Sequence, residues 1–292
     1  MAERLRHAAR STLPVLVVLA AVLVIWYAGA VWLNIDGARD MADDNATQWD
    51  LLAATMSQDR PVVPAPHQVA IAFWQSVFEQ PVVSPKSLVY HAGVTAFAAF
   101  LGFVIACGLG ITLAICIVNV LTLDRSLMPW IIASQTVPVL AIAPMVVVVL
   151  GNIGFTGLLP KALISGYLSF FPIVTGMVKG LRSPDPMQRD LMRTYSATGW
   201  QILAKLRWPA AMAFLMPSVK VAATLSLVGA IVAELPTGAQ AGLGARLLSG
   251  SYYGQTLQIW AALFAAALLA LLAIGLVDLA RLALIRTRGG RL

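Results

Sequence analysis

The chain is poor in charge. Asp, Glu, Lys and Arg make up 11% of its 292 residues, whereas hydrophobic residues make up 59%. Soluble domains typically carry about 25% charged and about 45–50% apolar residues. So little charge excludes an ordinary soluble fold and predicts an all-α membrane protein. The formal net charge of +7 does not indicate nucleic-acid binding, because the bases flank apolar segments instead of sharing one face of a soluble fold.

Residues that carry catalysis are also scarce. The three histidines, His7, His67 and His91, are not spaced as a metal pair, so we expect no metal site. Cys107 and Cys116 lie about 13 Å apart along a helix, too far to bridge within it, and are interpreted as small buried hydrophobes. No nucleophile, paired-carboxylate or histidine cluster falls within the apolar segments. A membrane-embedded enzyme is therefore disfavoured.

The chain lacks a phosphate-binding loop. No Gly-x-x-x-x-Gly-Lys-Ser/Thr motif occurs in it. It is therefore expected to bind no nucleotide or other cofactor itself. If ATP drives its function, the ATP must lie on a partner subunit.

Six apolar segments are long enough to cross a bilayer, whose hydrocarbon core takes about 20 helical residues. The first, residues 13–33, follows a basic stretch at 1–12 and could alternatively be a signal peptide cleaved near Ala28 to Ala30. The other five lie within residues 87–285. They are 87–123, 126–160, 161–179, 213–235 and 257–277.

The distribution of bases predicts the orientation. With a cytoplasmic N-terminus, 14 of the 20 bases lie inside, five lie outside, and Lys220 falls within the fifth span, where we expect it to snorkel inward. The basic tail at 286–292 is then cytoplasmic and the polar segment 34–86 extracytoplasmic. That segment contains a short amphipathic piece at 69–78. It is interpreted as a solvated cap, with a docking surface as the alternative.

One interior stretch, residues 190–217, is both polar and helically patterned. Apolar residues recur at three- to four-residue spacing from Leu191, and bases such as Arg193 and Lys205 fall between them. This pattern predicts an amphipathic helix or helix pair at the cytoplasmic face.

The same stretch resembles the cytoplasmic signature of the inner-membrane permeases of ABC importers, of the nitrate, taurine and sulfonate type. The signature runs Glu-Ala-Ala, three residues, Gly, nine residues, a hydrophobic residue, any residue, Leu and Pro. Aligned on Pro209, it places Asp190 at the Glu and Ser196 at the Gly, with Gly199 nearby as a source of flexibility. The resemblance continues at 62–69, 129–144 and 233–244.

This resemblance implies a type I importer permease with six transmembrane helices and a cytoplasmic coupling helix in the loop 181–212. It implies a bacterial inner-membrane location and four kinds of partner: ABC ATPase subunits, an extracytoplasmic solute-binding protein, a second copy of the chain and the lipid bilayer. The residues expected to couple to the ATPase are Asp190, Arg193, Tyr195, Ser196, Ala197, Thr198, Gly199, Trp200 and Pro209.

Polar groups within the spans are candidates for the translocation path. Gln135 and Pro138 are expected to share one helix face, with Thr136 beside them, and to line the path, although interhelical contact is an equal alternative. Glu234 is interpreted as a structural residue that caps a turn or pairs with Arg246. Its functional alternative is a part in an outer gate.

The resemblance implies transport of a small polar solute such as nitrate, an alkanesulfonate or a pyrimidine precursor. The competing hypothesis is an ion-driven secondary transporter or channel. That function calls for intramembrane acids or broken helices, and the sequence predicts no acid in the middle of a span.

Overall fold

The computed structural model describes residues 2–42, 47–236 and 240–287, and every regular element within those ranges is a helix. The predicted all-α membrane fold is confirmed, because five helices among the described residues are long and apolar enough to span a bilayer and one bent helix pair passes the same test as a pair. The chain divides into two compact units. They comprise Met1–Val89 with Arg246–Phe264, and Tyr90–Ala245 with Ala265–Leu292.

The first unit is built on a long helix, α1 (Ala2–Met41), and on shorter elements that follow it. These are α2 (Gln48–Ser57), α3 (Pro66–Trp74) and a π-helical turn, η1 (Gln75–Glu79). Buried Asn34 of α1 connects them, since its Oδ1 accepts the backbone N–H groups of Val62 and Val63 at 2.8 and 3.2 Å. A buried amide must be hydrogen-bonded, so Asn34 fixes the loop before α3 on α1.

The second unit contains most of the spanning helices. They are α4 (Leu88–Asn119), α5 (Leu121–Ala133), α6 (Val139–Asn152), α7 (Leu158–Arg182) and α10 (Trp208–Glu234). A 3₁₀ turn, η2 (Ser134–Thr136), separates α5 from α6. The helices α8 (Pro186–Thr194) and α9 (Gly199–Ile202) and the π-helical turn η3 (Leu203–Arg207) lie between α7 and α10. The last helices, α11 (Leu243–Tyr252) and α12 (Thr256–Thr287), have residues in both units.

Helices α4 and α7 run parallel at close range. A Cβ on Gly102 would lie 2.5 Å from the carbonyl oxygen of Ala162, and one on Gly110 would lie 2.8 Å from Ile173. The contacts therefore advance together along both helices. Glycine is required at both positions because any side chain would push α7 away.

Helix α10 runs antiparallel to α7. Near one end of the pair, a Cβ on Gly229 would lie 2.6 Å from Ser165, and near the other end a Cβ on Gly180 would lie 2.7 Å from Ala211. The Ser165 hydroxyl also donates to the carbonyl of Ser226 at 2.7 Å. Helix α7 thus packs directly on the backbones of both α4 and α10.

The third span is not the continuous helix expected from the sequence. Helices α5 and α6 are bent by 100° at the residues between them. Val137 is extended, with ψ of 123°, because proline disfavours helical backbone in the residue before it, and Pro138 lacks the N–H that would continue the helix. The expectation that Gln135 and Pro138 share one helix face is therefore wrong.

The bent pair nevertheless crosses the unit from one end to the other. Asp124 of α5 forms a 2.8 Å ion pair with Arg182 at the end of α7, whereas Lys161 marks the start of α7. Because α4 and α7 run parallel, the chain leaving α4 must return to the opposite end before α7 begins. The pair is one broken span and not a loop that re-enters on the same side.

Lys220 has a partner that the sequence did not predict, and its inward snorkelling stays a prediction. It forms an ion pair with Asp278 of α12, and both side chains are partly buried. Helix α12 continues past the predicted end at residue 277 as far as Thr287, which places Asp278 within it. Pairing with an opposite charge lowers the cost of holding Lys220 along a span.

Candidate functional site

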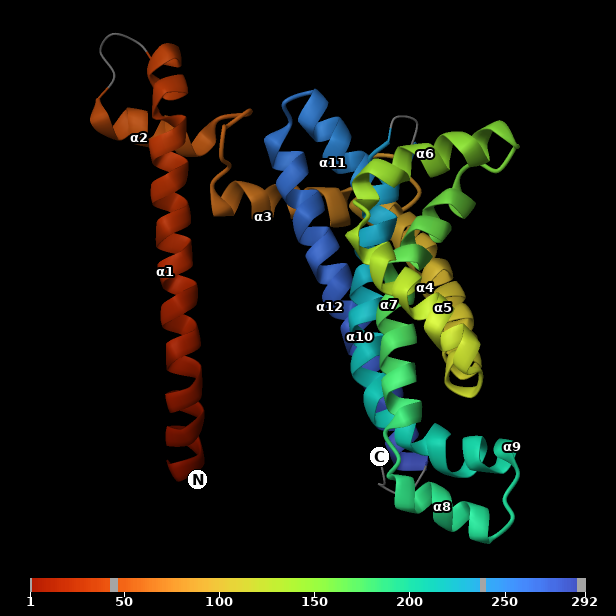
Figure 1. The fold of residues 1–292 in the computed structure, drawn as a ribbon. Helices are drawn as coiled ribbons and strands as arrows, with labels where there is room; N and C mark the ends of the chain where they lie inside the picture. Colours follow the sequence, from red (N-terminus) through yellow and green to blue (C-terminus); the bar gives the residue numbers. More distant parts are fainter. Residues whose placement is uncertain (1, 43–46, 237–239, 288–292) are drawn as a thin grey trace. The chain divides into compact units, whose positions relative to one another are not determined.

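The segment expected to contact an ATPase is a helix pair at one end of the second unit (Figure 1). The Asp185 side chain caps α8 by accepting the N–H of Met187 at 2.9 Å, and Pro186 occupies the first turn. The Thr198 side chain caps α9 in the same way through the N–H of Gln201. Two capped helices joined by a short turn confirm the helix pair that the pattern predicted.

The turn between the two helices depends on Ser196. Its φ is +54°, in the left-handed region that favours glycine. The N–H of Ser196 bonds the carbonyl of Arg193 at 2.8 Å, and the N–H of Ala197 bonds that of Met192 at 3.0 Å. These two bonds form a Schellman motif, which explains physically why a glycine suits this position. Gly199 does not supply the flexibility we expected, because it begins α9 with helical backbone.

The helix pair exposes large apolar side chains. Met187, Leu191 and Tyr195 follow one another at four-residue steps along α8 and are 80%, 57% and 78% exposed. Trp200 of α9 is 74% exposed. Every predicted coupling residue is exposed except Ala197, which is half-buried. Exposed apolar groups gathered on a polar segment mark a contact surface.

The same helix pair is fixed to the spans. Buried Leu203 of η3 packs in the core that includes Leu181 at the end of α7 and Ala211 near the start of α10. The close contact of Gly180 with Ala211 brings these two helices together at that point. A force on the exposed helix pair would therefore be transmitted to α7 and α10.

The predicted path residues Gln135, Thr136 and Pro138 lie together at the break in the third span, and all three are exposed. The hydroxyl of Thr136 donates to the carbonyl of Ala133 at 2.8 Å. The Tyr167 hydroxyl of α7 donates to the carbonyl of Ser134 at 2.5 Å. These bonds satisfy backbone groups that the break releases, and they leave the amide of Gln135 on the surface.

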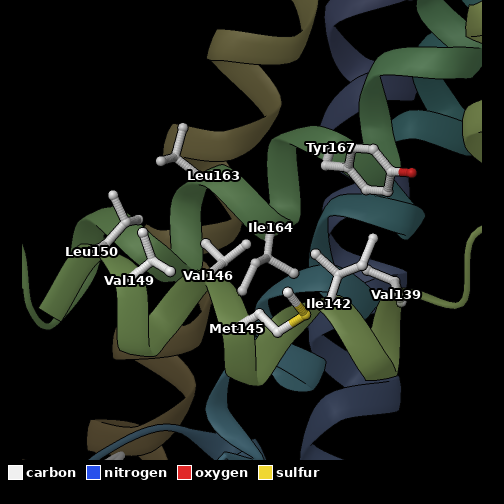
Figure 2. Close-up of a pocket in the computed structure, with 9 residues that line it drawn as sticks. All are labelled: Val139, Ile142, Met145, Val146, Val149, Leu150, Leu163, Ile164 and Tyr167. Atoms are coloured by element: carbon white, nitrogen blue, oxygen red, sulfur yellow. The ribbon is translucent and has the colours of Figure 1, made fainter. Parts of the chain in front are cut away.

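An apolar pocket of about 470 Å³ lies between α6 and α7, next to this break (Figure 2). Tyr167 is its one polar lining residue, and Figure 2 shows the ring beside Val139 at one end of the pocket, with Leu150 at the other. The full lining is Val139, Ile142, Met145, Val146, Val149, Leu150, Leu163, Ile164 and Tyr167. Such a lining suits an apolar or aromatic group and offers nothing to neutralise a free anion.

Glu234 ends α10 inside a fully buried polar cluster. Its carboxylate accepts the N–H of Gly244 at 2.9 Å and lies 2.9 and 3.0 Å from the hydroxyl of Thr95 on α4. Lys161 of α7 pairs with it at 3.4 Å and also donates to the carbonyl of Ala241 at 2.7 Å. The expected structural alternative, a pair with Arg246, is wrong, whereas the expected capping of the turn is confirmed by the bond to Gly244.

The loop after α10 is shaped around this carboxylate. Gly242 has a φ of +128°, and a Cβ there would lie 2.0 Å from the carboxyl carbon of Glu234. Its N–H donates to Nδ1 of His91 at 2.9 Å, and the N–H of Leu243 donates to Thr95 at 2.8 Å. The cluster thus joins α4, α7, α10 and residues 241–244. Its gate role stays a prediction.

Sequence reasoning missed Lys161, Thr95 and His91 as members of this cluster. Lys161 was recognisable as a base at the outer end of a predicted span, the end at which Glu234 was also placed. That coincidence was a usable signal. Thr95 and His91 carried none, because single polar residues in an apolar run have no directional pattern.

These features are typical of a transporter's membrane subunit. They are the spanning helices with one broken span, the exposed helix pair at one end and the buried polar cluster at the other. Residues 106–288 match the family described as binding-protein-dependent transport system inner membrane component, and the chain belongs to that family. It is an ABC transporter permease.

Relatives agree with this assignment. A "Probable ABC transporter permease protein" of Haemophilus influenzae is 27% identical over 74% of this chain and 82% of its own length. The riboflavin transport system permease protein RibX of Chloroflexus aurantiacus is 30% identical over 63% and 65%, respectively. The formylaminopyrimidine transport permease protein ThiX of Halalkalibacterium halodurans is 28% identical over 67% and 73%.

Replacing Ser196 by glycine should stabilise the turn between α8 and α9. A non-glycine residue in left-handed backbone costs about 1–2 kcal/mol, and glycine removes most of that cost. Hydrogen exchange across residues 186–202 should slow accordingly. Ser183→Gly is the matched control, because Ser183 also follows a helix but has a φ of −67°, and it should give no such protection. Faster exchange in Ser196→Gly would contradict the assigned turn.

Removing one partner of the buried ion pair should destabilise the protein strongly. Lys161→Met leaves the Glu234 carboxylate buried without its cation, a change that costs about 3–5 kcal/mol in comparable cases. The double variant with Glu234→Gln should recover part of that loss. Denaturant unfolding in detergent measures both. Arg193→Met is the control, since the exposed pair of Arg193 with Asp190 should contribute less than about 1 kcal/mol. Equal losses in Lys161→Met and Arg193→Met would refute the role given to the cluster.

Proposed function

We propose that the chain is the transmembrane subunit of an ATP-driven importer and that α8 and α9 dock on an ABC ATPase. The observation that carries this proposal is the exposed apolar row Met187, Leu191 and Tyr195 on a helix pair fixed to α7 and α10. Such a row is the anchor that a cleft on a partner protein would bury. The chain itself is proposed to bind no cofactor, with ATP held by the partner.

The charge of this end supports a cytoplasmic location for it. Arg125, Lys179, Arg182, Arg189, Arg193, Lys205, Arg207, Arg281 and Arg286 belong to the helix pair or to the adjoining ends of the spans. Cytoplasmic segments of membrane proteins are enriched in bases. With six crossings, both chain termini would lie in the cytoplasm and Glu234 would lie at the extracytoplasmic side.

Coupling would work by moving spans. ATP-driven closure of the ATPases displaces the helix pair, and the packing of Leu203 passes the displacement to α7 and α10. The path between two copies of the permease then alternates between facing in and facing out. Nucleotide supplies the difference in free energy between the two states, as any such switch requires.

Glu234 is proposed as part of the outer gate. The cluster around it holds residues 241–244 against α4 and α7. Because its polar groups are mutually satisfied, it resists partial opening and favours two discrete arrangements. A solute-binding protein that docks at this side would deliver its solute while the gate is open.

The ion-driven alternative has observations of its own. A span broken at Pro138 and the Lys220–Asp278 ion pair are the features that a secondary transporter would use. The family of the chain favours the ATP-driven function over this one.

Trp200→Glu or Leu191→Glu should abolish recruitment of the cognate ABC ATPase while the spans stay inserted. A charge at a contact that is buried in the complex should reduce co-purification by about tenfold or more. Trp49→Glu is the matched control, because Trp49 of α2 is equally exposed, at 79%, and lies in the other unit. Normal recruitment by Trp200→Glu, or solute uptake by vesicles without any ATPase, would contradict the proposal.

A nitrogen heterocycle is the solute class that we propose. The names of two relatives specify riboflavin and formylaminopyrimidine, and the apolar pocket beside Tyr167 suits a ring better than nitrate. Calorimetry of the cognate solute-binding protein should detect riboflavin or a pyrimidine. Binding of nitrate or an alkanesulfonate, with no heterocycle bound, would reject this class.

A further inference from the structure

The stretch that contains α3 is unusually free of charge. Residues 61–78 include no Asp, Glu, Lys or Arg, although they lie in a segment expected to be a solvated cap. A helix with one face in water normally carries charged groups on that face. Uncharged helix of this length therefore needs another environment for its exposed side.

One face of α3 and η1 is apolar and exposed. Ile71, Trp74 and Phe78 follow a helical spacing and are 55%, 58% and 63% exposed. The rings of Trp74 and Phe78 are in contact, with centroids 4.2 Å apart. Three large apolar side chains thus form one continuous row.

The start of α3 lies alongside the apolar part of α1. The indole N–H of Trp26 donates to the carbonyl of Pro64 at 2.9 Å, and the ring of Tyr27 stacks on His67. Trp26 precedes Leu33, the last residue of the apolar run, by seven positions, which is about 10 Å along a helix. The start of α3 therefore contacts α1 within its membrane-spanning part, about two turns before that part ends.

The direction of α3 fits a position along a membrane surface. Figure 1 shows α3 lying crosswise to α1, the span of the same unit. A helix crosswise to a span, near the end of the span's apolar run, lies in the plane of the interface. Trp26, which contacts the start of α3, lies next to Trp260, with ring centroids 4.9 Å apart. Tryptophan is enriched at membrane interfaces, so this pair supports an interfacial position for α3.

We propose that α3 and η1 form an interfacial helix whose row of Ile71, Trp74 and Phe78 inserts into the lipid leaflet in which α1 ends. Lipid fits this surface because the α1 segment that precedes the contact with α3 exposes large apolar side chains over residues 13–25 and belongs to a helix long and apolar enough to span a bilayer. An uncharged row offers no ionic group to a protein partner. The helix thereby fixes the depth at which α1 sits in the bilayer.

Helix α2 provides a contrast within the same unit. It also exposes a tryptophan, Trp49, but α2 contacts α1 at Asn34, the residue after the apolar run of α1, through the carbonyl of Thr55, and its first turn carries Asp50. Trp49 is therefore expected in water. The two tryptophans form a matched pair for a test of depth.

Spin labels at these two positions test the proposal. In a chain with Cys107→Ala and Cys116→Ala, Trp74→Cys and Trp49→Cys are labelled with a nitroxide and reconstituted in vesicles of phosphatidylethanolamine and phosphatidylglycerol. Oxygen concentrates in lipid and a nickel chelate stays in water. The ratio of oxygen to nickel accessibility should be about tenfold higher at position 74 than at position 49, as for a side chain buried in the acyl boundary.

Two outcomes would overturn the proposal. Equal ratios at positions 74 and 49 would place the row in water, and low accessibility to both reagents at position 74 would place it under protein. Ile71→Cys and Phe78→Cys repeat the measurement on the same row, and each variant is accepted only when it elutes as a single species in detergent. Agreement of these positions with Trp74→Cys completes the expected result.

Discussion

The packing of α7 against the backbones of α4 and α10 is the constraint on which the second unit depends. It works because the residues at the crossings are glycine, alanine and serine, which let the helices approach closely without a hydrophobic driving force in lipid. Ser165 lies at the centre. Its hydroxyl donates to the carbonyl of Ser226 on α10 and lies 3.4 Å from that of Ala99 on α4. The Glu234 cluster lies at one end of this three-helix core, and the exposed helix pair of α8 and α9 lies at the other.

Because α7 is shared by both ends, it connects the two candidate sites mechanically. Lys161 near its start belongs to the Glu234 cluster, and Leu181 near its end contacts the core that holds Leu203. The close contacts hold α7 tightly against α4 and α10, since densely packed interiors have low compressibility and transmit strain. Under the proposed coupling, a displacement of the exposed helix pair would therefore reach the far end of the unit through α7.

Much of this architecture could be predicted from the sequence, because membrane spans and amphipathic helices are encoded in local patterns. The lengths of the apolar runs predicted the crossings, and the amphipathic pattern of residues 190–217 predicted the helix pair. The Glu234 cluster could not be predicted, since Thr95 and Glu234 are 139 positions apart and no periodicity says which span ends meet. Pro138 indicates a break in the third span, but helices often tolerate proline. The bend angle of 100° therefore depends on tertiary packing. The left-handed backbone of Ser196 was not predicted, because serine rarely adopts it, although the alignment placed Ser196 at the glycine of the signature.

The charges of the second unit follow from this topology. Because α5 and α6 together cross the unit, α7 ends where α4 ends, and α10 begins there. The Lys220–Asp278 contact, together with the apolar cluster that joins Leu227 and Ala230 of α10 to Leu269 and Ala273 of α12, makes α12 antiparallel to α10, so its basic end lies there too. Within the described part of this unit, Lys161 is the sole base at the opposite end, and Glu234 neutralises it. Under the proposed coupling, an ABC ATPase that docks on the helix pair would meet many basic residues near its apolar contact, so acidic groups around its cleft would speed association more than they would strengthen binding.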